Sequence, residues 1–188
     1  MRQLDKDVEL ELKSYSDAYK KFKEEEKIFE NDFGEGRKVK RYLDRSKDDF
    51  LLATAVKNII ETPEMRLQLG LPKDFQNIYH WLIIISYYSM YHAATAAIAK
   101  KKIKSKEHEA TIASLAKHYV TAEELEFDFL ETLSYVYIKY IEGGRDKRRK
   151  AQCNVDIAYA RKEAYEVFED AKKFVKRLQE LLEEAHTK

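Results

Sequence analysis

Helix-breaking residues are scarce in this chain, and their scarcity restricts the fold more than any other feature of the sequence. Only five glycines and two prolines occur in 188 residues, too few for the many tight turns of a β-sandwich or a β-barrel. Between them, apolar residues recur every three or four positions, as they do along one face of an α-helix. The sequence therefore predicts an all-α fold, and a hydrophobic content of 44% is enough to fill one buried core.

The few breakers mark the limits of the first two expected helices. The apolar spacing over residues 4–29 indicates an amphipathic helix, which the glycine-containing segment 31–36 should end. A second helix is expected over residues 38–61, followed by a connector that Pro63 opens and Pro72 closes. The residues of the second helix expected to face the core are Tyr42, Phe50, Leu51, Ala55 and Ile59.

Three further helices are expected after the connector. The first of them should start near Asp74 and carry a long apolar run. Ser105 is then expected to cap a short helix, because a serine hydroxyl can accept a hydrogen bond from a free amide at a helix start. The next helix begins at a capping-box pattern, Thr121 followed by Glu124, and should stop at the double glycine 143–144.

A final amphipathic helix is expected over about residues 157–184. Its inward-facing residues are expected to be Ala160, Ala164, Val167, Phe168, Ala171, Val175 and Leu178. Together these segments predict an up-and-down bundle of about five helices over residues 37–188. Residues 1–36 add an amphipathic N-terminal helix as an extension to this bundle.

The apolar run at residues 81–99 contains no formally charged side chain when its histidine is counted as neutral. A membrane span is one interpretation of such a run. Its polar residues, among them Ser86, Ser89 and Thr95, favour a central buried helix instead. Residues 1–13 also lack the apolar stretch of a signal peptide, so we expect a soluble, cytoplasmic protein without membrane contact.

The protein as a whole is nearly neutral, with 35 Lys+Arg against 34 Asp+Glu, so its net charge predicts no attraction to a polyanion. Residues 145–150 differ, because they contain five cations and one anion. Such a cluster can hold phosphates electrostatically. It can equally be a solvated turn between two helices, and charge alone favours the turn.

Metal and cofactor sites have little support in the sequence. Cys153 is the only cysteine, which excludes an intramolecular disulfide and a cysteine-based zinc site. His92, His108 and His118 do not lie at a metal-ligand spacing from another histidine or a carboxylate. No metal and no cofactor is therefore expected.

The apolar run contains the string Tyr87-Tyr88-Ser-Met-Tyr91-His92-Ala-Ala. This string resembles the Tyr-Tyr-x-Met-[Phe/Tyr]-His-Ala-Ala helix of HEPN domains (higher eukaryotes and prokaryotes nucleotide-binding). The segment that ends at His108 resembles the Lys-x-His turn that follows in many members. The arginine-rich segment before the last helix lies where the family has its functional motif. The resemblance extends over about residues 38–182.

This resemblance implies a bundle of four to five helices that is usually a homodimer. Many members of the family are metal-independent ribonucleases or toxins, and many are encoded beside a small nucleotidyltransferase. Their motif is an arginine followed, after four to six residues, by a histidine. In that chemistry a ribose 2′-hydroxyl attacks the adjacent phosphate, the histidine moves the proton and the arginine stabilises the charged transition state.

The sequence departs from that motif at the histidine. Asn154 follows Arg149 after four residues, and no histidine lies between Arg145 and Arg161. Asparagine can hydrogen-bond a phosphate but cannot transfer a proton near pH 7. We therefore expect a protein that binds RNA or a nucleotide, or partners a nucleotidyltransferase, with little or no nuclease activity. Its expected phosphate-binding residues are Arg145, Arg148, Arg149 and Asn154.

Two alternatives remain open from the sequence. In the first, His92 or His108 supplies the proton transfer and the protein is an active metal-independent endoribonuclease. A lone histidine on a helix is more often a hydrogen-bonding residue between helices, which argues against this role. In the second, the basic segment docks a protein partner, and the protein is an interaction module that does not bind nucleic acid.

Overall fold

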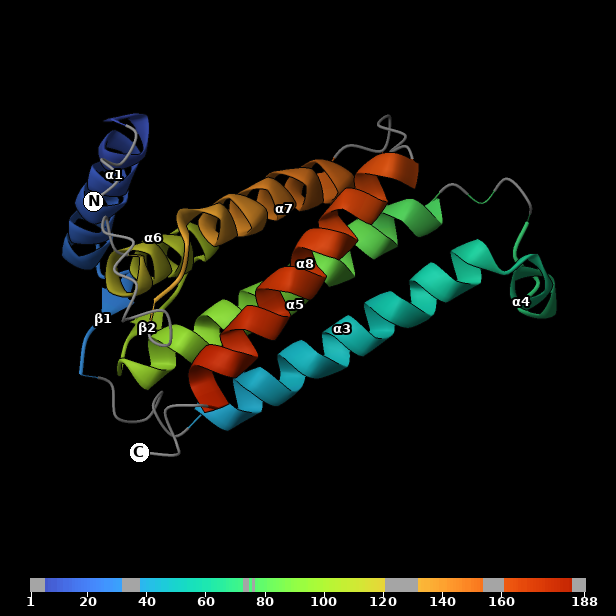
Figure 1. The fold of residues 1–188 in the computed structure, drawn as a ribbon, viewed down its shortest axis with the longest axis horizontal. Helices are drawn as coiled ribbons and strands as arrows, with labels where there is room; N and C mark the ends of the chain where they lie inside the picture. Colours follow the sequence, from blue (N-terminus) through green and yellow to red (C-terminus); the bar gives the residue numbers. More distant parts are fainter. Residues whose placement is uncertain are drawn as a thin grey trace.

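The computed structural model describes residues 6–31, 38–72, 75, 77–120, 132–153 and 161–183. Within these ranges the chain forms seven α-helices and one antiparallel sheet of two short strands (Figure 1). The expected all-α bundle with an added N-terminal helix is therefore confirmed. The division of the chain at residue 36 stays a prediction.

Helix α5 (Asn77–Lys100) is the centre of the bundle (Figure 1). The helices that pack against it are α3 (Val39–Glu61), α6 (His108–Tyr119), α7 (Tyr135–Cys153) and α8 (Arg161–Glu183). By length and composition α5 could span a membrane, but 72% of its apolar window is buried inside the bundle. This is the property of a core helix, as expected for residues 81–99.

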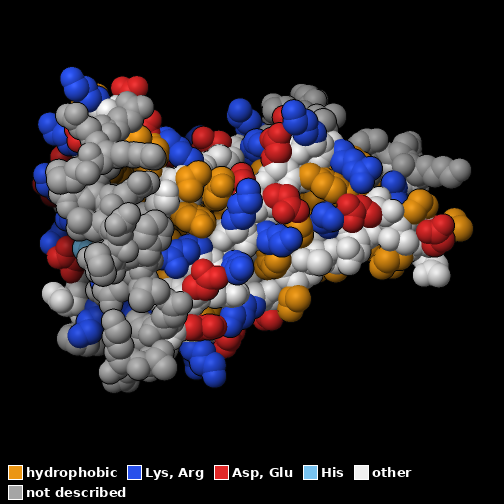
Figure 2. Space-filling model, in the orientation of Figure 1, with side chains coloured by type: hydrophobic (Ala, Val, Ile, Leu, Met, Phe, Trp, Pro, Cys, Tyr) orange, Lys and Arg blue, Asp and Glu red, His pale blue; other side chains and the backbone are white. Residues whose placement is uncertain are grey.

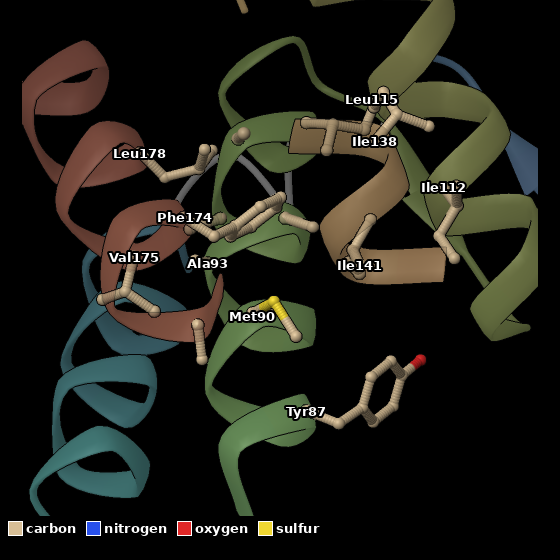
Figure 3. Close-up of a cluster of buried hydrophobic side chains, with 14 of the residues drawn as sticks. Tyr87, Met90, Ala93, Ile112, Leu115, Ile138, Ile141, Phe174, Val175 and Leu178 are labelled. Carbon is tan, nitrogen blue, oxygen red and sulfur yellow. The ribbon is translucent and has the colours of Figure 1, made fainter. Parts of the chain in front are cut away.

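The hydrophobic core lies where α5 meets α6, α7 and α8 (Figure 3). The alanines at positions 93, 94, 96 and 97 of α5 are completely buried, and their small side chains let the neighbouring helices approach closely. Helix α8 contributes Phe174 to this core. The inward face predicted for α8 is confirmed at Ala164, Val167, Phe168, Ala171, Val175 and Leu178, while Ala160 lies outside the described residues.

Helix α3 has the expected limits but presents a different face to the core. Leu51 is 67% exposed and Ala55 is also exposed, so the prediction that they face inward is wrong. Apolar residues lie on several sides of α3, so its sequence does not settle which side packs against α5 and α8. One of the buried contacts is polar, because the Ser46 hydroxyl donates to the Ser89 carbonyl at 2.7 Å. The buried residues of α3 are Leu43, Ser46, Ala53 and Ile60.

The expected connector after α3 contains a short helix, α4 (Pro63–Gln68). Pro63 starts it, because a fixed φ suits the first helical position and the missing N–H has no partner there. No residue of α4 is buried, and Leu67 is 81% exposed. Helix α4 lies at one end of the molecule, where hydrophobic side chains reach the surface (Figures 1 and 2).

Helix α1 (Lys6–Glu24) packs against α6 and ends earlier than the predicted limit of residue 29. The chain turns at Glu26, whose φ is 54°, and continues into strand β1 (Ile28–Phe29). Strand β1 pairs with β2 (Lys104–Ser105), and this pairing replaces the last turn of the predicted helix. Strands of two residues leave no periodic signal in a sequence.

Two predicted helix starts have different outcomes. Ser105 does not cap α6, because it lies in β2, and Glu107 takes the N-cap position. The Ser105 hydroxyl instead shares a 2.6 Å hydrogen bond with the Thr111 hydroxyl. The capping-box pattern of Thr121 and Glu124 lies outside the described residues.

Candidate phosphate-binding site

The basic segment 145–150 lies inside a helix rather than in a turn between helices. Helix α7 continues through Gly143 and Gly144 to Cys153, so the predicted helix end at the double glycine is wrong. Side chains of neighbouring residues therefore point to different sides of the helix, and the arginines differ in exposure. Arg145 and Arg148, one turn apart, are half-buried, whereas Arg149 is exposed.

Gly144 explains why the double glycine does not end the helix. Gly144 is buried, and a Cβ atom at this position would lie 2.6 Å from Met90 Cε and 3.4 Å from Tyr87 Cδ2. A Cβ atom at Gly143 would meet nothing within 4 Å. The absence of a side chain at Gly144 thus lets α7 pack closely on α5, at the point where the two arginines begin.

Arg148 lies beside two tyrosines of α5. Its guanidinium carbon is 5.1 Å from the ring centre of Tyr87 and 5.8 Å from that of Tyr88, both within the range of cation–π attraction. One terminal nitrogen, Nη1, donates to Gln152 Oε1 at 2.6 Å. Its Nε is buried and has no hydrogen-bond partner among the described residues.

Arg145 connects α7 to the first turn of α6. Its Nη2 donates a 3.0 Å hydrogen bond to Asp146 Oδ1, and its Nη1 lies 3.4 Å from Glu109 Oε1. These two carboxylates balance part of the positive charge. The guanidinium stays near the start of α6, where the helix dipole also favours an anion.

His108, the first residue of α6, faces both arginines. Its Nδ1 is 2.5 Å from the Tyr87 hydroxyl, and its ring stacks on Tyr91 with the ring centres 4.1 Å apart. Burial lowers the pKa of His108 to about 4, and the nearby Arg148, His92 and Arg145 act in the same direction. His108 is therefore neutral at pH 7 and able to accept a proton.

Tyr87 joins the core to this site. The residue is completely buried, and its side chain lies at the edge of the core cluster with the hydroxyl directed away from Met90 (Figure 3). Burial raises the pKa of this hydroxyl, while Arg148 acts in the opposite direction. The hydroxyl therefore keeps its proton, and the tautomer of the neutral His108 decides whether the hydroxyl donates to Nδ1 or accepts from it.

His92 extends the same group of rings toward α3. Its Nδ1 is 2.7 Å from Asp49 Oδ2, and the other carboxylate oxygen of Asp49 lies 3.4 Å from Arg45 Nε. The His92 ring lies 6.1 Å from Tyr88 and 5.6 Å from Tyr91, measured between ring centres. His92 thus makes the expected hydrogen bond between helices, and it does so beside His108.

Four of the six residues proposed from the sequence come together in this site: His92, His108, Arg145 and Arg148. Arg149 is exposed on α7, and Asn154 lies outside the described residues. The other members of the site were not predicted from the sequence, where tyrosines at helical spacing are also typical of a core. These members are Asp49, Tyr87, Tyr88, Tyr91 and Gly144.

The surroundings of the site are of mixed charge. On the face shown in Figure 2, basic and acidic side chains are intermixed. Lys147 of α7, for example, lies 3.2 Å from Glu166 of α8. No group of three histidine, cysteine, aspartate or glutamate side chains suited to a metal ion occurs within the part of the chain that the structure describes.

Two comparisons with known protein sequences found no match. The chain matches no protein-family model, and no curated protein sequence matches it. The resemblance to HEPN domains therefore stays a prediction. The same holds for the expected homodimer, the nucleotidyltransferase partner and the cytoplasmic location.

Proposed function

We propose that this protein binds RNA or a nucleotide at the site formed by Arg145, Arg148 and His108. The observation that carries the proposal is the position of Arg148 beside Tyr87 and within the electrostatic reach of His108. Guanidinium groups bind phosphate oxygens through charged, paired hydrogen bonds. A phosphate bound here would meet two guanidinium groups and a neutral imidazole.

Five neighbouring rings, which we call the ring cluster, favour a nucleotide over a simple acidic ligand. They belong to Tyr87, Tyr88, Tyr91, His92 and His108. Tyr88, Tyr91 and His92 are only half-buried, and they lie next to the arginines. Aromatic side chains beside a cationic groove are the usual platform for unstacked nucleobases. An acidic protein partner would use the arginines but would gain little from the rings.

The direct test is a binding titration with a short single-stranded 2′-O-methyl RNA, which lacks the 2′-hydroxyl needed for self-cleavage. Arg148→Ala should weaken binding roughly 10- to 100-fold, because a charged hydrogen bond to phosphate is lost. Arg149→Ala is the matched control, since it removes the same charge from the exposed side of α7. It should weaken binding less than about threefold.

Both titrations should be repeated over a salt series, because phosphate contacts make binding salt-dependent. Equal effects of the two arginine substitutions would mean that RNA contacts the basic segment without entering the site. No binding by the unaltered protein would favour the interaction-module alternative.

A second candidate function is metal-independent cleavage of RNA. The observation that favours it is the presence of two histidines on the same ring cluster, one neutral and one hydrogen-bonded to a carboxylate. In the tautomer whose Nδ1–H donates to Tyr87, Nε2 of His108 would accept the proton of a ribose 2′-hydroxyl, whose oxygen attacks the phosphorus. The 5′-oxygen would leave with a proton from His92, and Arg148 would stabilise the phosphorane charge.

The products of that reaction are a 2′,3′-cyclic phosphate and a free 5′-hydroxyl. Cleavage of unmodified RNA in the presence of a chelator should therefore yield these ends. His108→Gln and His92→Gln should each abolish it, whereas His118→Gln should not. If the protein binds RNA but does not cleave it, the second candidate function is wrong and the first remains.

A further inference from the structure

The four residues that precede His108 are held by the start of the chain. We refer to residues 6–31, which comprise α1, the following turn and β1, as the N-terminal arm. Strand β1 pairs in antiparallel fashion with β2, which brings Ile28 opposite Ser105 and Phe29 opposite Lys104. The next backbone amide, that of Lys106, donates to the Lys27 carbonyl at 2.9 Å.

Side chains strengthen this backbone pairing. Lys27 Nζ lies 3.3 Å from Glu107 Oε2, and Lys106 Nζ lies 4.7 Å from the ring centre of Phe29. Ile28 is only 2% exposed and belongs to the main core. Every residue from 104 to 107 is therefore paired with, or in contact with, residues 27–29.

The start of α6 needs such support because its own cap is weak. Glu107 occupies the N-cap position, but its side chain makes no capping hydrogen bond. Serine, threonine, aspartate or asparagine would normally supply that bond. The pairing with β1 instead holds the residues that lead into α6, up to Lys106 directly before the N-cap.

The N-terminal arm is itself firmly attached. Tyr19 of α1 is 1% exposed, and its ring lies 3.9 Å from Lys117 Nζ near the far end of α6. Glu11 of α1 pairs with Lys139 of α7 at 2.5 Å. The N-terminal arm thus contacts both helices that carry the site, α6 and α7.

We infer that the N-terminal arm is a positioning element of the site, in which Ile28 and Phe29 hold His108 against Tyr87 and Arg148. The inference rests on the proposed function in one respect: it assumes that the ligand binds where the His108 ring lies against Tyr87 and Arg148. None of the arm residues belongs to the ring cluster, so their effect reaches the ligand through His108.

The test uses Ile28→Ala in the full-length protein, with NMR titration of the His108 ring as the readout. The charged and titratable groups around this ring lie on α7 and α5: Arg145, Arg148, His92, Tyr87, Tyr88 and Tyr91. If the ring leaves this position and gains solvent, the pKa of His108 should rise toward its ordinary value of ~6.5. RNA binding should weaken roughly three- to tenfold in parallel.

Ile60→Ala is the matched control, because it makes the same truncation at a buried isoleucine at the α4 end of α3. It should leave the His108 titration unchanged, and Ile28→Val should restore the original value. Phe29→Ala serves if Ile28→Ala does not fold. An unchanged His108 titration in the Ile28 or Phe29 variant, or an equal change in Ile60→Ala, would overturn the inference.

The two proposals fail separately in this experiment. The His108 titration is measured without RNA, so it reports on the N-terminal arm even if the unaltered protein binds no RNA. Conversely, suppose that a variant shows a moved His108 ring and yet binds RNA with unchanged affinity. That result would count against His108 as part of the ligand site.

Discussion

The two ends of helix α6 carry two histidines in similar degrees of burial but with different neighbours. His108 at the start hydrogen-bonds to Tyr87 and faces two arginines. His118 near the end packs edge-on against Tyr19, and its Nε2 is buried with no hydrogen-bond partner among the described residues. Burial lowers the pKa of both imidazoles.

The difference lies in what surrounds each neutral ring. The cations near His118 are Lys117 and Lys101, and Glu30 partly offsets them. The N-terminal arm also packs onto that end of α6, through Tyr19. At His108 the arginines adjoin half-buried rings. A neutral histidine is therefore found at both ends of α6, but among the described residues only at His108 do arginines and partly accessible aromatic rings accompany it.

The largest expected effect on stability comes from removing a tyrosine hydroxyl at each end of α6, that of Tyr87 or that of Tyr19. Tyr87→Phe leaves Nδ1 of His108 without its partner and should reduce the free energy of unfolding by about 1–3 kcal/mol. Tyr19→Phe removes a 2.6 Å hydrogen bond to the more exposed Glu30 and should cost only about 0.5–1.5 kcal/mol. Urea unfolding of both variants measures this difference, and a larger loss for Tyr19→Phe would contradict the comparison.

The pH dependence of stability should include a contribution from His108. The unfolded chain binds the proton near pH 6.5 and the folded chain only near pH 4, so protonation favours unfolding. The stability from the neutral ring is complete above about pH 6.5 and is lost as the pH falls toward 4. After allowance for solvent screening, this loss is about 2 kcal/mol.

His108→Gln should remove most of that loss, because glutamine does not titrate. Unfolding measured from pH 7 to pH 4 in the two proteins provides the test. If both lose stability in parallel over this range, the pKa of His108 is not held down in the folded protein.

The third effect tests the close packing of α7 on α5 at Gly144, which brings α7 near His108. Gly144→Ala should be less stable than Gly143→Ala by roughly 1–3 kcal/mol, because the new methyl group crowds Met90 and Tyr87. Gly143→Ala gains helix propensity without a contact and should be stabilising by about 1 kcal/mol. NMR signals of His108 should shift in Gly144→Ala, while those of His118 stay in place.

The smallest effect is expected at the other end of α6. The pKa of His118 is lowered by burial and by Lys117, so His118→Gln should also reduce the acid-induced loss of stability. The reduction should be smaller than in His108→Gln, because Glu30 partly stabilises the charged ring. RNA binding should be unchanged, and a loss of binding would show that the site extends to this end.

The sequence predicted the bundle well because long helices leave a periodic signal. The limits of α3 agree with those expected within one residue, and the run at residues 81–99 falls inside α5. The strand pair β1–β2 left no such signal. The double glycine was misinterpreted because a glycine that ends a helix and one that packs a helix against a neighbour look alike in sequence.

The site was predicted as separate residues rather than as a group. His92 and His108 were selected from the resemblance, and Arg145 and Arg148 from local charge together with the resemblance. What brings them together is the close packing at Gly144 and the fixed start of α6, and both are tertiary features. Tyr87 was overlooked because its ring is a core residue and only its hydroxyl serves the site.

The most direct test of the central claim is an NMR titration of His108 and His118 with and without saturating 2′-O-methyl RNA. A phosphate held by Arg148 would stabilise a charged imidazole beside it. We expect the pKa of His108 to rise from about 4 when RNA is bound, while that of His118 does not change. Bound RNA that leaves the titration of His108 unaltered would contradict the assignment of this site.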